Sequence, residues 1–281
     1  MAVRAGEEDG RAYVWARENG SDRMRRFEAD HVFVACGAIG STRLVANSLG
    51  LFDRTVLVRE AAQFVLPFLS MRPTSDPSRE PRFTLNQFNM LISPGGGALD
   101  LALLHFYTYD SAFEDGLPSF LRRPIARGAK EQLLRRLSVA FGYLPSWASP
   151  SLRLRFQPPV ADGGLPALEI RRDEEHWREN GMMRAVLARL IRSARYLDLW
   201  PVLPSIVFSS GAKSYHFGSS FPHAERRTRE LTTDRLGRPG SWDRIHMVDA
   251  AVFPNVPATT FTLTVMANAH RIACESLGLS G

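Results

Sequence analysis

Two segments, one near each end of the chain, share the pattern of a short apolar strand, a turn and a helix. Residues 31–36 (HVFVAC) form an apolar run, and a glycine-containing turn leads into a helical pattern over 42–49 that Gly50 ends. Residues 244–253 are predicted as a strand and residues 262–277 as a helix. Strand, turn and helix make up the elementary unit of a nucleotide-binding α/β sheet. We therefore expect both chain ends to contribute to one such sheet.

Between these ends the apolar residues recur with a period near two. In 151–157, Leu152, Leu154 and Phe156 alternate with arginines. Alternation of this kind predicts half-buried antiparallel strands, and it is found over 84–92, 99–109, 151–157 and 167–171. A hairpin is predicted at the start of the chain, with strands over 11–17 and 25–30 and its turn at Asn19-Gly20.

Two helices are predicted among these strands, over 117–141 and over 174–199, the second with Asp173 as its N-cap. The predicted fold class is therefore a mixture of α/β and α+β. Residues 1–57 and 214–281 are expected to form a partial α/β domain. Residues 58–213 are expected to form an inserted domain of antiparallel sheet plus helices.

The net charge of +6 is concentrated in residues 117–145, which hold six basic side chains and one acid. Such a stretch is either a solvated helix face or a surface that attracts anionic lipid, nucleic acid or an acidic partner. No nucleic-acid-binding motif accompanies it, so nucleic acid is not an expected partner. The longest apolar runs are too short to span a bilayer, and no apolar leader is present. Together with two distant cysteines, expected as buried thiols, these features predict a cytoplasmic protein without membrane association.

Three segments contain residue types suited to binding a ligand or to accepting a proton from a substrate. In 36–41, Gly37 and Gly40 let a ligand approach the backbone, although many plain turns also contain glycine. In 249–262, Thr259 or Thr260 is predicted to cap a helix whose amides face an anion, or simply to cap it. In 214–222, His216 is placed to accept an alcohol proton, or to be a structural histidine. The other histidines show no metal-ligand spacing, so no metal is expected.

Together, and in this order, the three segments resemble the glucose-methanol-choline (GMC) family of flavin-dependent oxidoreductases. HVFVACGAIGSTRLVANSL (31–49) is similar to the family's strand, turn and helix, and 216–223 is similar to its histidine loop. The longest and most specific match is IHMVDAAVFPNVPATTFTLTVMANAHRIA (245–273), which resembles the C-terminal signature VVDASVFPxxPxxNPTLTIMALAERIA. The region between is recognised only by its position, as the substrate-binding domain.

The resemblance implies an FAD cofactor and an alcohol substrate whose CH–OH group is oxidised by hydride transfer to the flavin. It implies that His216 is the catalytic base and Thr260 a second hydrogen-bond partner of the substrate oxygen. The family usually has Asn or His at the position of Thr260, and a threonine hydroxyl cannot act as a base. The residues that the resemblance assigns to the cofactor are Gly37, Ala38, Asp249, Ala250, Thr260, Phe261 and Thr262.

One part of the family pattern has no counterpart here. No G-x-G-x-x-G turn with an acid about 20 residues further on precedes His31. The resemblance therefore implies an incomplete Rossmann domain, with roughly 200 residues lacking, the size of a typical domain. The leading prediction is the substrate-binding and catalytic part of an FAD enzyme that needs a complementary FAD-binding chain. The alternatives are a truncated product and a non-catalytic binding or scaffold protein that uses residues 117–145.

Overall fold

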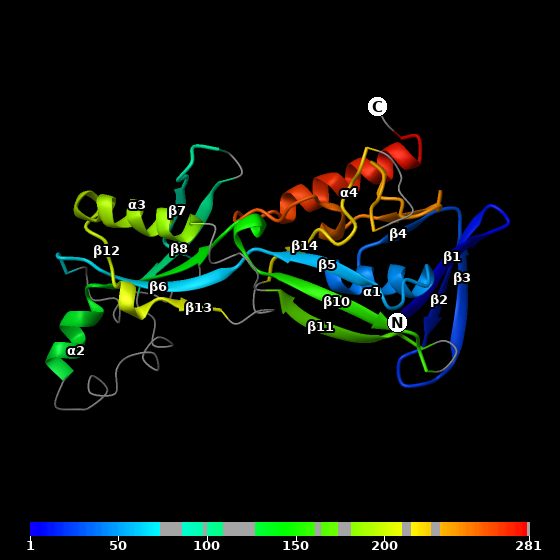
Figure 1. Ribbon diagram of the computed structural model, residues 1–281, viewed down its shortest axis with the longest axis horizontal. Coiled ribbons are helices and arrows are strands. Elements are labelled where there is room, and N and C mark those ends of the chain that lie inside the picture. Colours follow the sequence, from blue (N-terminus) through cyan, green and yellow to red (C-terminus); the bar gives the residue numbers. More distant parts are fainter. Residues whose placement is uncertain are drawn as a thin grey trace.

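The computed structural model shows an elongated molecule with a sheet and helix α3 at one end and helices α1 and α4 at the other (Figure 1). Within the part of the chain that it describes, no helix is long and apolar enough to cross a membrane. The described residues are 1–73, 86–97, 100–108, 127–160, 164–173, 181–209, 215–225 and 231–279.

Segments from both chain ends meet in one core. Strands β1 (Ala2–Glu8), β2 (Arg11–Arg17) and β3 (Met24–Ala29) form an antiparallel meander, which confirms the predicted hairpin and adds β1 to it. Strand β4 (Val32–Val34) pairs in parallel with β15 (Ile245–Met247). Helix α1 (Ala38–Ser48) packs against β1 and contributes Leu44 and Val45 to the core. The predicted joining of the two chain ends is therefore confirmed.

A four-stranded sheet lies next to this core. Its order is β11–β10–β5–β14, and all three pairings are antiparallel. The strands are β5 (Thr55–Glu60), β10 (Ser151–Gln157), β11 (Ala167–Asp173) and β14 (Phe217–Gly218). The alternation predicted in β10 is confirmed, because Leu152, Leu154 and Phe156 are buried. Strand β5 crosses the expected boundary between residues 57 and 58, so the division into domains stays a prediction.

A six-stranded antiparallel sheet forms the other end of the molecule. Its order is β12–β6–β9–β8–β7, with β13 also paired to β6. The strands are β6 (Gln63–Leu69), β7 (Phe88–Ile92), β8 (Ala102–Thr108), β9 (Leu137–Tyr143), β12 (Trp200–Pro201) and β13 (Val207–Phe208). Helix α3 (Met182–Leu197) packs its buried side on one face of this sheet, through Val186 and Leu190. A short 3-10 turn, η5 (Leu203–Ser205), joins β12 to β13.

Several predicted element bounds are wrong. Among the described residues of the predicted helix 117–141, helix α2 covers Arg127–Leu134, and residues 137–143 form β9 because β6 and β8 supply hydrogen-bonding partners on both sides. Helix α3 has Gly181 rather than Asp173 as its N-cap; Asp173 ends β11, where its carboxylate pairs with Arg153 at 2.7 Å. Of the predicted strand 244–253, only β15 is extended, and residues 250–252 form the 3-10 turn η6 (Ala250–Val252). Residues 117–126 and 174–180 lie outside the described residues.

Helix α4 (Thr262–Ser276) forms as predicted, but most of its apolar stripe does not face a core. Ile272 is its one buried residue in the described structure. Leu263 is 78% exposed and Met266 62% exposed, and Leu277, just beyond the helix, is 48% exposed. An apolar helix stripe normally faces a core or a partner. The exposed stripe of α4 departs from this pattern in the described structure.

Candidate functional site

The fold brings the three predicted segments together around Asp249. This buried carboxylate accepts hydrogen bonds from the Ala251 N–H at 3.0 Å and from the Ser41 hydroxyl, whose oxygen accepts the Cys36 N–H at 2.9 Å. Burial raises the pKa of Asp249, while the bonds from Ser41, Ala251 and the Gly37 N–H act in the opposite direction. Asp249 thus ties the Gly37 turn to η6.

The histidine loop runs along η6. Backbone N–H groups of Ser219 and Phe221 donate to the carbonyls of Ala250 and Ala251, each at 3.0 Å. A Cβ on Gly218 would lie 2.5 Å from the Ala250 carbonyl oxygen, so this close approach requires glycine. Since Gly218 lies two residues after His216, the same contact fixes the position of the imidazole.

Replacing Gly218 by alanine should therefore destabilise the chain. The added methyl group meets backbone rather than a flexible side chain, so the loop must shift, at a cost of about 1–3 kcal/mol. Urea unfolding measures the change in the free energy of unfolding. Gly128→Ala is the matched control, because a Cβ there meets nothing within 4 Å and alanine favours the α2 helix. Equal stability of the two variants would contradict the proposed close contact.

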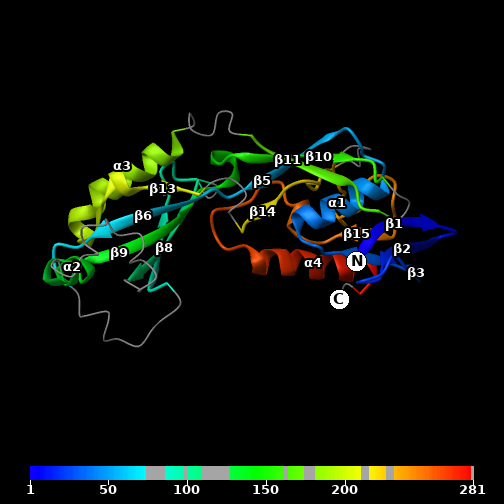
Figure 2. The ribbon, with the colours of Figure 1, turned by 90° about the horizontal axis from the view of Figure 1, so that it is seen from below.

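An open cavity of about 430 Å³ lies where these segments meet. Gly37, with φ of 77°, precedes the first turn of α1, and Phe261 and Thr262 begin α4, so two helix N-termini border one cavity. Both helices lie on the same side of the four-stranded sheet near β14 in Figure 2. The lining includes six of the seven residues assigned to the cofactor: Gly37, Ala38, Asp249, Ala250, Phe261 and Thr262.

Thr260 is the remaining residue of that set, and it lies elsewhere. It is exposed and lines a second cavity of about 280 Å³, together with Trp147 and Thr264. Phe261 borders both cavities. Phe261 is also the N-cap residue of α4, so neither Thr259 nor Thr260 caps the helix as predicted. The helix begins one residue later than a threonine cap would require.

His216 lies among aromatic rings between these cavities and the six-stranded sheet. Its imidazole stacks on the Tyr143 ring, with centroids 5.1 Å apart, and meets the Phe261 ring edge-on at 5.3 Å. Burial lowers the pKa of His216, and the nearby charge of His105 lowers it further. A lowered pKa keeps the imidazole neutral near pH 7, the form that accepts a proton.

His105 and Tyr143 were missed by the sequence analysis. The Tyr143 ring contacts both histidines and meets His105 edge-on at 5.6 Å. The His105 Nδ1 lies 2.5 Å from the side-chain oxygen of Asn89, so Nδ1 carries the proton that it donates. The alternation in 99–109 could have identified His105 from the sequence. Leu104 and Phe106 are buried toward α3, so His105 lies on the opposite face of the strand.

We predict that His105→Gln raises the pKa of His216. The substitution removes a neighbouring group whose positive charge opposes protonation of His216. An NMR titration of histidine ring resonances, with His216 assigned from a His216→Gln variant, measures the shift without any cofactor. Tyr107→Phe is the control, because Tyr107 lies on the same strand and carries no charge near pH 7. An unchanged pKa in His105→Gln would rule out this electrostatic coupling.

The two cysteines are free, and Cys36 is exposed at the edge of the 430 Å³ cavity. The expectation of two buried thiols is therefore wrong, because the strand ends before Cys36. The pKa of Cys36 is raised by partial burial and by Asp249. That shift disfavours the reactive thiolate at neutral pH.

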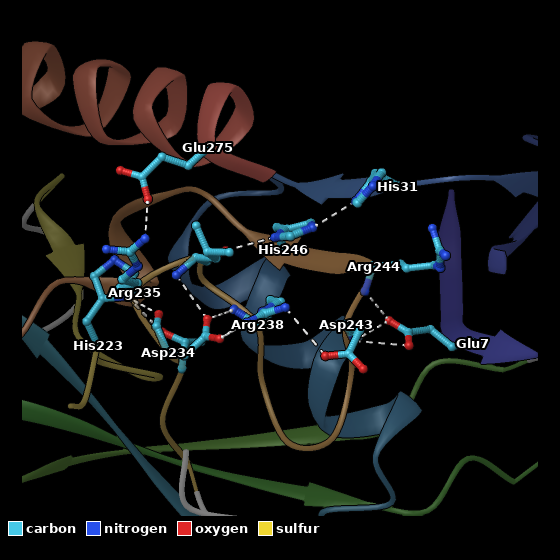
Figure 3. A network of polar contacts seen from close by, with 12 residues as sticks. Glu7, His31, His223, Asp234, Arg235, Arg238, Asp243, Arg244, His246 and Glu275 are labelled. Carbon is cyan, nitrogen blue, oxygen red and sulfur yellow. Dashed lines mark hydrogen bonds and ion pairs between the residues drawn. The ribbon is translucent and has the colours of Figure 1, made fainter. Parts of the chain in front are cut away.

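A polar network behind the site holds β4 and β15 in place (Figure 3). The His246 Nδ1 donates to the Leu236 carbonyl at 2.9 Å, so its Nε2 accepts from His31 at 3.1 Å. Asp234 pairs with Arg238 at 2.7 Å, and Glu7 accepts the Arg244 N–H at 2.6 Å. These contacts satisfy buried polar groups, so the network has a structural role.

Comparison with known proteins identifies a solved structure with a similar fold. A scan against protein-family models and a search of the curated proteins find no match. Among solved structures, the chain is similar to the crystal structure of pyridoxine 4-oxidase from Mesorbium loti, with a TM-score of 0.62 and 13% sequence identity. The similarity covers 98% of this chain and 56% of that one, so the chain spans little more than half the length of this neighbour. The two proteins therefore share a fold over nearly all of the present chain.

Proposed function

We propose that this chain is the substrate-binding and catalytic part of a GMC-type FAD-dependent oxidoreductase that oxidises a CH–OH group. The observation that carries the proposal is the position of His216. A half-buried imidazole with a lowered pKa contacts Phe261, which lines a cavity together with other residues assigned to the cofactor. The fold shared with an enzyme described as pyridoxine 4-oxidase agrees with an oxidoreductase.

The residues around the 430 Å³ cavity fit a flavin. Gly37 is exposed, and a Cβ built on it meets nothing within 4 Å, so its backbone is open to a ligand. The N-termini of α1 and α4 present N–H groups, which suit phosphate and carbonyl oxygens. Ala38 and Ala250 add small side chains that allow close approach. Phe261 and Val265 supply apolar surface for a planar ring.

A flavin held by these residues would supply the hydride acceptor for the substrate carbon. His216 accepts the hydroxyl proton, since its neutral form predominates at neutral pH. Tyr143 and Phe261 hold the imidazole by ring contacts, and Gly218 fixes the loop that carries it. Asp249 does not contribute as an acid; it orients the Gly37 turn through Ser41 and the backbone.

A complementary FAD-binding part belongs to the proposal. In the described structure β4 pairs with β15 alone, and parallel strands are normally found in larger sheets covered on both faces. Helix α4 lies near β4 in Figure 1, and its side chains Leu263 and Met266 are exposed. Both features are expected where another part of an α/β domain packs. That part is either a separate chain or a further segment of a longer protein.

Flavin binding tests the proposal. The chain is produced alone and together with the protein encoded immediately upstream, and visible flavin absorbance is measured on the purified material. We expect flavin to be retained when a part bearing a G-x-G-x-x-G turn is present. The absence of flavin from both preparations, when the upstream protein carries that turn and associates with the chain, would refute the enzyme proposal.

A further inference from the structure

The second cavity, of about 280 Å³, has a composition unlike the surface around it. Among the described residues, those that line it carry no charged side chain, although 23% of the residues in the chain are charged. Trp147, Pro145, Phe253 and Leu101 supply much of the wall. Its side-chain hydrogen-bonding groups are the hydroxyls of Thr259, Thr260 and Thr264, the Asn255 amide and the indole N–H of Trp147. Apolar walls with a few polar groups are typical of small-molecule sites.

The walls of this cavity are held rigidly. The Ser146 N–H donates to the Val256 carbonyl at 2.9 Å, and the Val256 N–H donates to the Ser146 hydroxyl at 3.0 Å. This reciprocal pair joins the 3-10 turn η4 (Ser146–Ala148), which carries Trp147, to the loop that leads into α4. Ser146 and Val256 are 2% and 1% exposed, so the pair is protected from water. A cavity built in this way is formed before a ligand arrives.

One residue, Phe261, links the cavity to the surroundings of His216. Phe261 lines it and also meets the His216 imidazole edge-on at 5.3 Å. Pro145 follows Tyr143 by two residues, and Tyr143 stacks on His216. A molecule in the cavity therefore lies one aromatic ring away from the imidazole.

We propose that this cavity binds the apolar body of an uncharged alcohol substrate, with the threonine hydroxyls at its rim contacting the substrate's polar end. The proposal rests on the proposed function for its chemistry, because His216 must reach the substrate hydroxyl past the edge of Phe261. The volume suits a compact group such as a single ring, since ligand pockets start at roughly 300 Å³. A carboxylate is disfavoured, because the uncharged lining offers it no ion pair.

Binding of benzyl alcohol and benzoate to the chain without flavin tests this assignment. The two probes share one ring and differ in charge. We expect benzyl alcohol to bind at least about tenfold more tightly than benzoate, measured by saturation-transfer NMR and by tryptophan fluorescence. Equal affinity for both probes, or no binding of benzyl alcohol, would overturn the proposal.

A pair of variants on α4 locates the binding. Thr264→Phe places a ring in the cavity, whereas Leu263→Phe adds a similar ring at a neighbouring exposed position that does not line it. We expect Thr264→Phe to weaken benzyl alcohol binding at least about tenfold and Leu263→Phe to leave it unchanged. The same loss in both variants, or in neither, contradicts the site. Flavin binding without benzyl alcohol binding would refute this proposal alone, and the reverse result would refute only the proposed function.

Discussion

His216→Ala is expected to slow reduction of bound flavin by an alcohol substrate by about 10²- to 10⁴-fold, the range typical of removing a general base. The His216 imidazole has a lowered pKa and ring contacts to both Tyr143 and Phe261. Thr260 cannot replace it, since a threonine hydroxyl does not take up a proton near pH 7. Stopped-flow measurement of flavin bleaching under anaerobic conditions reports this step directly.

The pH dependence of the same step provides an independent readout. Neutral imidazole is the active form, so reduction falls as the pH falls through the pKa of His216. Burial lowers that pKa below the ordinary value of about 6.5, so activity should persist to lower pH than an exposed histidine allows. Flavin content must be equal in wild type and variant for the comparison to hold. Unchanged reduction in His216→Ala would remove His216 from the mechanism.

Leu263→Glu combined with Met266→Glu is expected to weaken association with the FAD-binding part by at least about 100-fold. Both side chains are largely exposed here, so the chain itself should fold normally. Burying two carboxylates in an apolar interface is strongly unfavourable, and central interface positions typically contribute about 2 kcal/mol or more each. Analytical ultracentrifugation of the mixed chains, or flavin retention in a longer protein, measures the loss.

The matched control carries the same substitutions on another exposed apolar surface. Ile191 and Leu197 on α3 are 48% and 46% exposed, at the opposite end of the molecule from α4 (Figure 1). Ile191→Glu with Leu197→Glu should leave association and flavin retention unchanged. If both double variants behave alike, the α4 stripe is not the surface at which the FAD-binding part packs.

The sequence alone determined the local elements and the order of the chemically active segments. Alternation predicted β10 and β8, because one buried face imposes a period of two on side chains whatever the rest of the chain does. The Gly37 turn, the histidine loop and the start of α4 were identified from residue types and spacing. Boundaries were less accurate: residues 137–143 have a pattern compatible with a helix and became a strand because β6 and β8 flank them.

The tertiary structure alone decided which of these segments touch. Asp249 and Ser41 are separated by 208 residues, and their bond joins two segments, assigned to the cofactor by resemblance, that no local pattern connects. Tyr143 contacts His216, and His105 contacts Tyr143, because β8 pairs with β9 and the fold brings the end of β9 to the histidine loop, so their positions were not readable from spacing. The same holds for Thr260, which packing directs to the second cavity. Local sequence sets the backbone geometry of each segment, whereas side-chain contacts between distant segments depend on how the sheets pack.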